Sequence, residues 1–229
     1  MIDTNFDRTF MRTYDSAWLK ENTTLFKNID SYHELMIHYY CAIREVTTKL
    51  EILNDELRFK NKRNPIEDIR SRVKSPKSVA KKLEKKGLEL TIPNITENLN
   101  DVAGVRVICS FVDDIFDVAK MLTSQDDITL IETKNYIKFP KENGYRSLHL
   151  VLEVPIFLSG GKKPMRVEVQ IRTIAMDFWA SLEHQLKYKK NIPNAEEISL
   201  ELKECADIIA ATDLRMQDIR DKINMEPEL

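Results

Sequence analysis

Positive charge is concentrated between Arg70 and Lys86, a segment with eight basic residues and a single acid, Glu84. The basic residues are Arg70, Arg72, Lys74, Lys77, Lys81, Lys82, Lys85 and Lys86. Because the whole chain carries a formal net charge of −2, they form a local concentration of positive potential. Such a patch can bind the phosphates of a nucleotide. The alternative interpretation is a solvated, lysine-rich helix face.

The sequence pattern divides this patch into a short strand and a helix. Arg72 and Lys74 are two residues apart in a strand-like segment, so we expect them to face the same side. A helix follows, with Ser75 as N-cap, Pro76 at its first position and Gly87 just past its end. The helix N-terminus favours anions. Further candidates for phosphate binding on one face of this helix are Ser78, Lys81, Lys82 and Lys85.

Two carboxylates could serve chemistry at a bound phosphate. Asp101 directly precedes the strand-like segment that carries Arg106. Since Mg²⁺ usually takes one or two carboxylates together with substrate phosphates, Asp101 is a candidate metal ligand, with a turn or cap role as the alternative. Glu168 shares one face of the strand-like segment VEVQIRT with Gln170 and Arg172. This carboxylate could abstract a proton.

An aromatic residue and several cations surround Gly144 in the segment KFPKENGYRSLH. These residues are Lys138, Lys141, Tyr145, Arg146 and His149. An aromatic ring beside cations can stack on a base while its phosphates are bound. We expect Tyr145 at the tip of a loop and His149 on the following strand, on the same face as Tyr145, with a purely structural histidine as the alternative. Further along, Asp177 could accept hydrogen bonds from the N1–H and the amine of guanine, which would favour guanine over adenine.

The scarcity of glycine excludes two common phosphate-binding motifs. With five glycines in 229 residues, neither G-x-x-x-x-G-K-[ST] nor G-x-G-x-x-G can be built, so charged side chains must hold any phosphates. Cys41, Cys109 and Cys205 contain no C-x-x-C and are typical of buried reduced thiols. There is no signal pattern at the N-terminus and no long apolar run, so we expect a cytoplasmic protein with no membrane association.

Long helices are expected at both ends of the chain. The segment from Asp30 to about Phe59 has no Gly or Pro and repeats apolar residues at three- and four-residue steps, with Asp30 or Ser31 as N-cap. Further terminal helices are expected over residues 3–25, from Ile174, and from Ala195 to about Asn224.

The middle of the chain alternates between strand-like and helical patterns. Two β-rich segments flank the turn SGGKKP, which is typical of a hairpin. The sequence therefore predicts an α+β fold with a mixed four- to five-stranded sheet flanked by helices. We divide it into an N-terminal helical region (1–64), a core (65–190) and a C-terminal helical region (191–229), all within one compact domain.

Four motifs in this order resemble the synthetase domain of the RelA/SpoT family: RVKSPKSVAKKLEKKG, DVAGVRVIC, ENGYRSLH and VEVQIRTIAMDFWASLEHQLKYK. The resemblance covers about half the chain, and the short length leaves no room for the other domains of long family members. It implies a nucleotidyltransferase-like fold and a small alarmone synthetase, in which the long N-terminal segment favours the RelP type over the RelQ type. Such an enzyme is a GTP diphosphokinase without hydrolase activity. It transfers pyrophosphate from ATP to the 3′-hydroxyl of GDP or GTP, giving ppGpp or pppGpp and AMP.

The resemblance also implies roles for individual residues. Arg72 and Arg106 would sandwich the adenine of ATP, and its phosphates would be bound by Lys74, Ser78, Lys82 and Lys85. Asp101 would bind Mg²⁺, and Glu168 would orient or deprotonate the 3′-hydroxyl and also touch the metal. Tyr145 would stack on guanine, with Asp177 at the guanine edge. The remaining residues of the GDP/GTP site would be Lys134, Lys141, Arg146, His149 and Gln170.

Other readings of the same residues stay open. The family resemblance implies a homotetramer built through the terminal helices. Binding of nucleic acid is left open, but no sequence feature indicates it. An RNA- or nucleotide-binding regulator would use the same basic and aromatic residues, although Asp101 and Glu168 argue against pure binding. A nucleotidyltransferase that donates a nucleoside monophosphate would release pyrophosphate instead of AMP. A purely structural protein is the remaining alternative.

Overall fold

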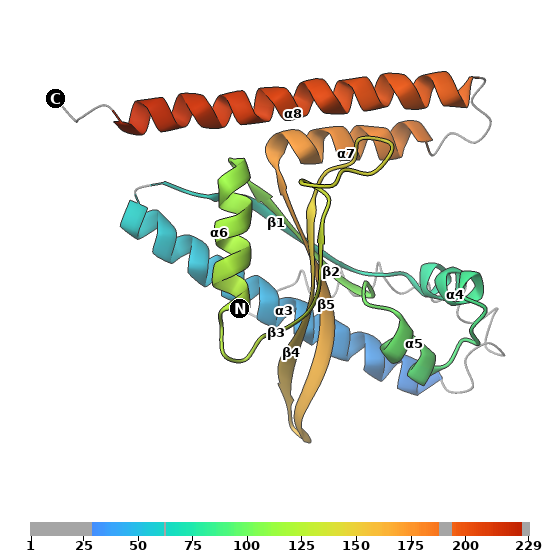
Figure 1. Cartoon of the computed structure of the whole chain (residues 1–229). Helices are drawn as coiled ribbons and strands as arrows, with labels where there is room; N and C mark the ends of the chain where they lie inside the picture. Colours follow the sequence, from blue (N-terminus) through green and yellow to red (C-terminus); the bar gives the residue numbers. More distant parts are fainter. Residues whose placement is uncertain (1–28, 62, 188–193, 226–229) are drawn as a thin grey trace.

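The structure is a computed structural model that describes residues 29–61, 63–187 and 194–225 (Figure 1). The helix expected over residues 3–25 lies outside the described residues. Within them, the helices are α3 (Ile29–Asn61), α4 (Pro76–Lys85), α5 (Ile92–Asn98), α6 (Val112–Thr123), α7 (Ile174–Lys187) and α8 (Ala195–Met225). The strands are β1 (Ile66–Val73), β2 (Ala103–Cys109), β3 (Thr129–Asn135), β4 (Leu148–Leu158) and β5 (Gly161–Thr173). The predicted α+β fold with a mixed sheet is confirmed.

The five strands form one sheet in the order β1-β2-β5-β4-β3. β2 and β5 are parallel, and the other neighbouring pairs are antiparallel. The register places one polar residue from every strand in a single row across the sheet: Arg70, Arg106, Gln170, His149 and Lys134. Registered neighbours project to the same face. The sheet therefore gathers residues from five separate segments on one surface.

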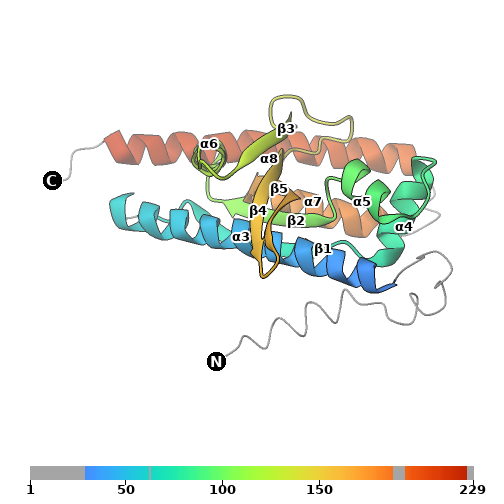
Figure 2. The same ribbon diagram turned by 90° about the horizontal axis from the view of Figure 1, so that it is seen from below.

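The other face of the sheet is apolar and covered by helices. Val105 and Val107 of β2 and Val169 and Ile171 of β5 alternate with the polar positions and belong to one buried core. Residues of α3 and α6 belong to the same core, and both helices pack against strands. The two long helices, α3 and α8, run across the molecule with the strands between them (Figures 1 and 2).

The local signals placed most element ends correctly. Ser75 caps α4, its side chain accepting from the Ser78 amide, and Gly87 follows the helix with φ of 69°. The cap predicted for the first long helix is wrong, because α3 already includes Ile29. The sequence analysis also missed the short helix α5, whose N-cap is Thr91.

Three further expectations can be compared with the structure. Tyr145 lies in the loop before β4, as expected, and it contacts His149 of that strand. All three cysteines are free, but Cys205 is exposed, so the expectation of a buried thiol is wrong there. Within the described ranges, no helix has both the length and the apolar character needed to cross a membrane.

Candidate active site

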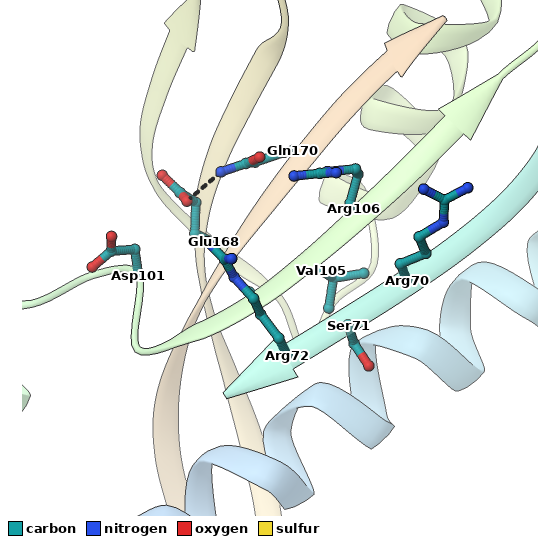
Figure 3. Close-up of a pocket in the computed structure, with 9 residues that line it drawn as sticks. Arg70, Ser71, Arg72, Asp101, Val105, Arg106, Glu168 and Gln170 are labelled. Atoms are coloured by element: carbon teal, nitrogen blue, oxygen red, sulfur yellow. Dashed lines mark hydrogen bonds between the residues drawn. The ribbon is translucent and has the colours of Figure 1, made fainter. Parts of the chain in front are cut away.

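A cavity of about 250 Å³ opens over the polar face of β1, β2 and β5 (Figure 3). Arg72 and Arg106 project into it, and Asp101 and Glu168 lie at the same end of it. Asp101 reaches this position because it lies two residues before β2, at the end of the strand where Gly104 pairs with Glu168 of β5. The other lining residues are Arg70, Ser71, Gly104, Val105 and Gln170. The cavity thus combines cations with two carboxylates.

Two lysines from the predicted phosphate-binding patch hold Asp101. Lys74 Nζ lies 2.6 Å and Lys82 Nζ 2.7 Å from Asp101 Oδ2. Burial disfavours the charged carboxylate, but the hydrogen bonds from the two lysines outweigh it, so the pKa of Asp101 is below its ordinary value. The second oxygen, Oδ1, is buried and has no hydrogen-bond partner in the described part of the chain. A buried, ionised and unpartnered oxygen is suited to a cation.

Glu168 is held from two sides by neighbours in the cross-strand row. His149 Nδ1 lies 3.3 Å from its Oε1, and Gln170 Nε2 donates to its Oε2 at 2.8 Å. Burial would raise the pKa of Glu168, but these two hydrogen bonds lower it overall. The carboxylate is therefore ionised near neutral pH and fixed in orientation.

Asp177 joins the arginines of the site. It lies in the first turn of α7, is buried, and accepts from Arg172 at 3.1 Å, Arg106 at 3.3 Å and Arg70 at 3.4 Å. Its oxygens thus face guanidinium groups, where the sequence analysis expected the edge of a base. Burial and the nearby Arg172 lower the pKa of Arg106, whose buried Nε has no partner among the described residues.

An aromatic cluster with a cation beside it forms the far end of the polar face. Tyr145 and His149 meet edge to face, and the Tyr145 hydroxyl lies 2.9 Å from His149 Nε2. Lys141 Nζ lies 4.7 Å from the ring centroid of Tyr136 and 4.9 Å from that of Tyr145. Tyr136 was missed as a site residue: it lies inside the strand-like segment DITLIETKNYIKF of the sequence, whereas in the structure it directly follows β3. The structure thus brings Lys141, Tyr145 and His149 together as expected.

The remaining candidate site residues do not line the cavity. Lys134 pairs with Glu132 at 3.1 Å and is the register partner of His149. The Ser78 hydroxyl contacts that of Ser75, and Lys85 is exposed on α4. Arg146 is not brought to the cavity, because its guanidinium points to α8 and donates to the Ala206 carbonyl and to Asp207. Its partner lies 60 residues further along the chain, beyond the reach of local pattern analysis.

Comparison with known protein families shows to which family the chain belongs. A family model described as the region found in RelA / SpoT proteins matches residues 71–193. This chain belongs to the RelA/SpoT family. The match begins on β1 and ends beyond α7, so it contains every residue that lines the cavity except Arg70. The RelP subtype stays a prediction, because the N-terminal segment on which it rests lies partly outside the described residues.

Individual RelA/SpoT relatives cover nearly the whole chain. The GTP pyrophosphokinase YwaC of Bacillus subtilis is 43% identical over 85% of this chain and 92% of its own length. The crystal structure of small alarmone synthetase 1 of Bacillus subtilis bound to its product pppGpp is 35% identical, with a TM-score of 0.77 over 86% of this chain and 99% of the other. The same protein bound to AMPCPP gives a TM-score of 0.72 at 34% identity, over 86% of this chain and all of the other. These matches confirm the family and fold predicted from the four motifs.

Proposed function

We propose that this protein is a GTP diphosphokinase that transfers the pyrophosphate of ATP to the 3′-hydroxyl of GDP or GTP and releases AMP. Family membership, and relatives named GTP pyrophosphokinases, support the activity. The main observation behind this proposal is that two ionised carboxylates, the fixed Glu168 and Asp101, line the same cavity together with arginines. A protein that only bound nucleotides would gain little from two carboxylates beside phosphates.

Each part of the reaction has a candidate residue. Glu168 accepts the proton of the 3′-hydroxyl, whose oxygen attacks the β-phosphorus of ATP. The bond between the β-phosphorus and the oxygen that bridges it to the α-phosphorus breaks, and AMP leaves. Arg72 and Arg106 hold the adenine. The residues proposed for the ATP phosphates are Lys74, Ser78, Lys82 and Lys85, and catalysis by these groups is chiefly alignment and charge stabilisation.

The acceptor nucleotide is assigned to the aromatic end of the polar face. We propose that Tyr145 stacks on guanine, with Lys141 and His149 at the phosphates, and that Lys134 and Gln170 complete this site. Asp177 reaches guanine only if an arginine releases one of its oxygens, and Arg146 acts on the loop instead of the nucleotide. The homotetramer and the cytoplasmic location also stay proposals, as do the three regions 1–64, 65–190 and 191–229.

The residues at the cavity fit a magnesium ion shared with substrate. Among the described residues, no group of three or more His, Cys, Asp or Glu side chains could hold a metal. Mg²⁺ needs only one or two carboxylates when phosphates supply further ligands, and the unpartnered Oδ1 of Asp101 offers one, with Glu168 as the second. When bound, the ion would neutralise charge on the phosphates during transfer.

The test is to incubate the full chain with ATP, Mg²⁺ and either GDP or GTP and to separate the products by chromatography. We expect AMP and a 3′-pyrophosphorylated guanosine nucleotide. Glu168→Gln, which keeps the size of the side chain, should lower kcat by about 1,000-fold, since general base catalysis contributes roughly 10²–10⁴-fold. Release of pyrophosphate in place of AMP would indicate a nucleotidyltransferase, and full activity of the variant would remove Glu168 from the role of base.

A further inference from the structure

The buried side chain of Arg172 makes contacts that the roles assigned above do not explain. This residue is next to last in β5 and only 4% exposed. The guanidinium uses all three nitrogens. It donates to the Tyr145 hydroxyl at 2.5 Å, to Asp177 at 3.1 Å, to Gln170 Oε1 at 3.2 Å and to Ser147 Oγ at 3.4 Å. A buried cation with this many partners is fixed in place.

Toward the acceptor site, Arg172 holds the Tyr145 ring in two ways. Nη2 donates to the hydroxyl, and the guanidinium carbon lies 5.0 Å from the ring centroid. The same hydroxyl lies 2.9 Å from His149 Nε2, so it is held between two side chains. Because Tyr145 itself lies in a loop, these contacts provide the rigidity that a strand would otherwise give.

Toward the reacting hydroxyl, Arg172 sets the orientation of the Gln170 amide. An arginine can only donate, so the atom of Gln170 that faces it must be the carbonyl oxygen. The amide nitrogen is then turned to Glu168 and donates to Oε2 at 2.8 Å. Reversal of the amide would set two oxygens against each other at Glu168. Arg172 therefore fixes, through Gln170, the donor that holds the carboxylate.

Toward the ATP site, Arg172 shares one oxygen of Asp177 with Arg106. Both arginines donate to Oδ1, at 3.1 Å and 3.3 Å. Arg106 has Asp177 as a partner whether or not Arg172 is present, and Arg70 contacts the second oxygen. Loss of Arg172 should therefore disturb the ATP side less than the acceptor side.

We propose that Arg172 is a positioning residue for the acceptor nucleotide, which aligns the stacking ring of Tyr145 with the base Glu168. This inference rests on the proposed function, since it needs guanine to stack on Tyr145. Lysine is no substitute, because an ammonium is a point donor and cannot reach Tyr145, Gln170 and Asp177 together as a planar guanidinium does.

The experiment measures GDP affinity by calorimetry without ATP, followed by steady-state kinetics, on Arg172→Gln and Arg172→Lys. Both should bind GDP about tenfold more weakly, as expected for lost charge-assisted hydrogen bonds. The KM for ATP should change by at most about twofold, because Asp177 keeps two arginines. The matched control is Arg166→Gln, on the same strand, whose arginine instead donates to Glu97 O and Asn100 Oδ1. It should bind GDP as the wild type does.

A second variant separates positioning from a general loss of structure. Tyr145→Phe keeps the ring but removes the hydroxyl that accepts from Arg172. If Arg172 acts through that hydroxyl, its replacement in the Tyr145→Phe background should weaken GDP binding by much less than tenfold. Independent effects of the two changes, or a lower kcat with both KM values and the GDP affinity unchanged, would overturn the proposal. A wild type that binds GDP but forms no AMP would instead refute the proposed function.

Discussion

The two sides of the candidate site are held mainly by different parts of the chain, although Asp177 of α7 also contacts Arg106 on the donor side. On the donor side, Lys74 and Lys82 contact Asp101 within one segment, and Lys74 is only 27 residues from Asp101. On the acceptor side, the loop over residues 136–147 is held by the C-terminal helices. Asn143 donates to Glu183 of α7 at 3.0 Å, and Arg146 donates to Ala206 O of α8 at 3.2 Å. Changes in α8 should therefore reach the acceptor nucleotide and leave ATP binding intact.

Among variants that act on only one of the two sides, the largest effect is expected on the donor side, from Asp101→Asn. An amide cannot offer the charged, unpartnered oxygen proposed for Mg²⁺, and it leaves Lys74 and Lys82 without their carboxylate. We expect kcat/KM for ATP to fall by about 100-fold or more, as for other losses of charge stabilisation at a transferring phosphoryl group. GDP affinity measured without ATP should stay unchanged. AMP formation at varied Mg²⁺ is the measurement, with the exposed Asp117→Asn of α6 as control.

Gly144→Ala should have the next largest effect, on the acceptor side alone. Gly144 has φ of 85°, and a Cβ there would lie 2.5 Å from Ala206 Cβ of α8. The loop must therefore move away from α8. Because backbone strain of this kind costs of order 1–3 kcal/mol, we expect the KM for GDP or GTP to rise about tenfold. The KM for ATP should not change.

Two companion variants of Gly144→Ala test whether contact with α8 is the cause. Ala206→Gly in the same chain removes the methyl group that collides, and should recover part of the acceptor KM but not the part due to the positive φ. Gly160→Ala serves as the control, because nothing lies within 4 Å of a Cβ at that position. A raised KM for ATP in Gly144→Ala would contradict the separation of the two sides.

The contrast between the donor side and the acceptor side also explains which parts of the site the sequence could predict. The cap at Ser75, the turn at Gly87 and the alternation in VEVQIRT are local signals, and they located the helix α4 and the strand β5 that carry the predicted lysines and Glu168. Arg146 was assigned to the nucleotide as one of the cations around Gly144, whereas its partners lie on α8. Arg172 was noticed only as part of an alternating strand face. Its role depends on a loop and a helix that meet only in the folded chain.

A smaller effect is expected from Arg146→Gln. The variant loses the contacts with Ala206 O and with the exposed Asp207, but the loop keeps its packing of Gly144 against α8. We expect the acceptor KM to rise by about two- to threefold, because exposed ion pairs contribute little. Lys203→Gln is the matched control, since it removes the other partner of Asp207 and leaves Arg146 in place. Equal KM changes in both variants would place the effect in α8 itself and not in the loop.

The smallest effect concerns Glu168, which lies where the two sides meet. Burial raises the pKa of Glu168, and the hydrogen bond from Gln170 helps to lower it. Gln170→Met removes this hydrogen bond, so the pKa of Glu168 should rise. The acid limb of kcat/KM should move to higher pH, while kcat at pH 8 changes by no more than about twofold because Glu168 is still ionised there. The limb should move equally whether ATP or GDP is varied, since the transfer between the two nucleotides needs this carboxylate in its ionised form. A shift seen with only one substrate would show that Gln170 serves one nucleotide and not the base.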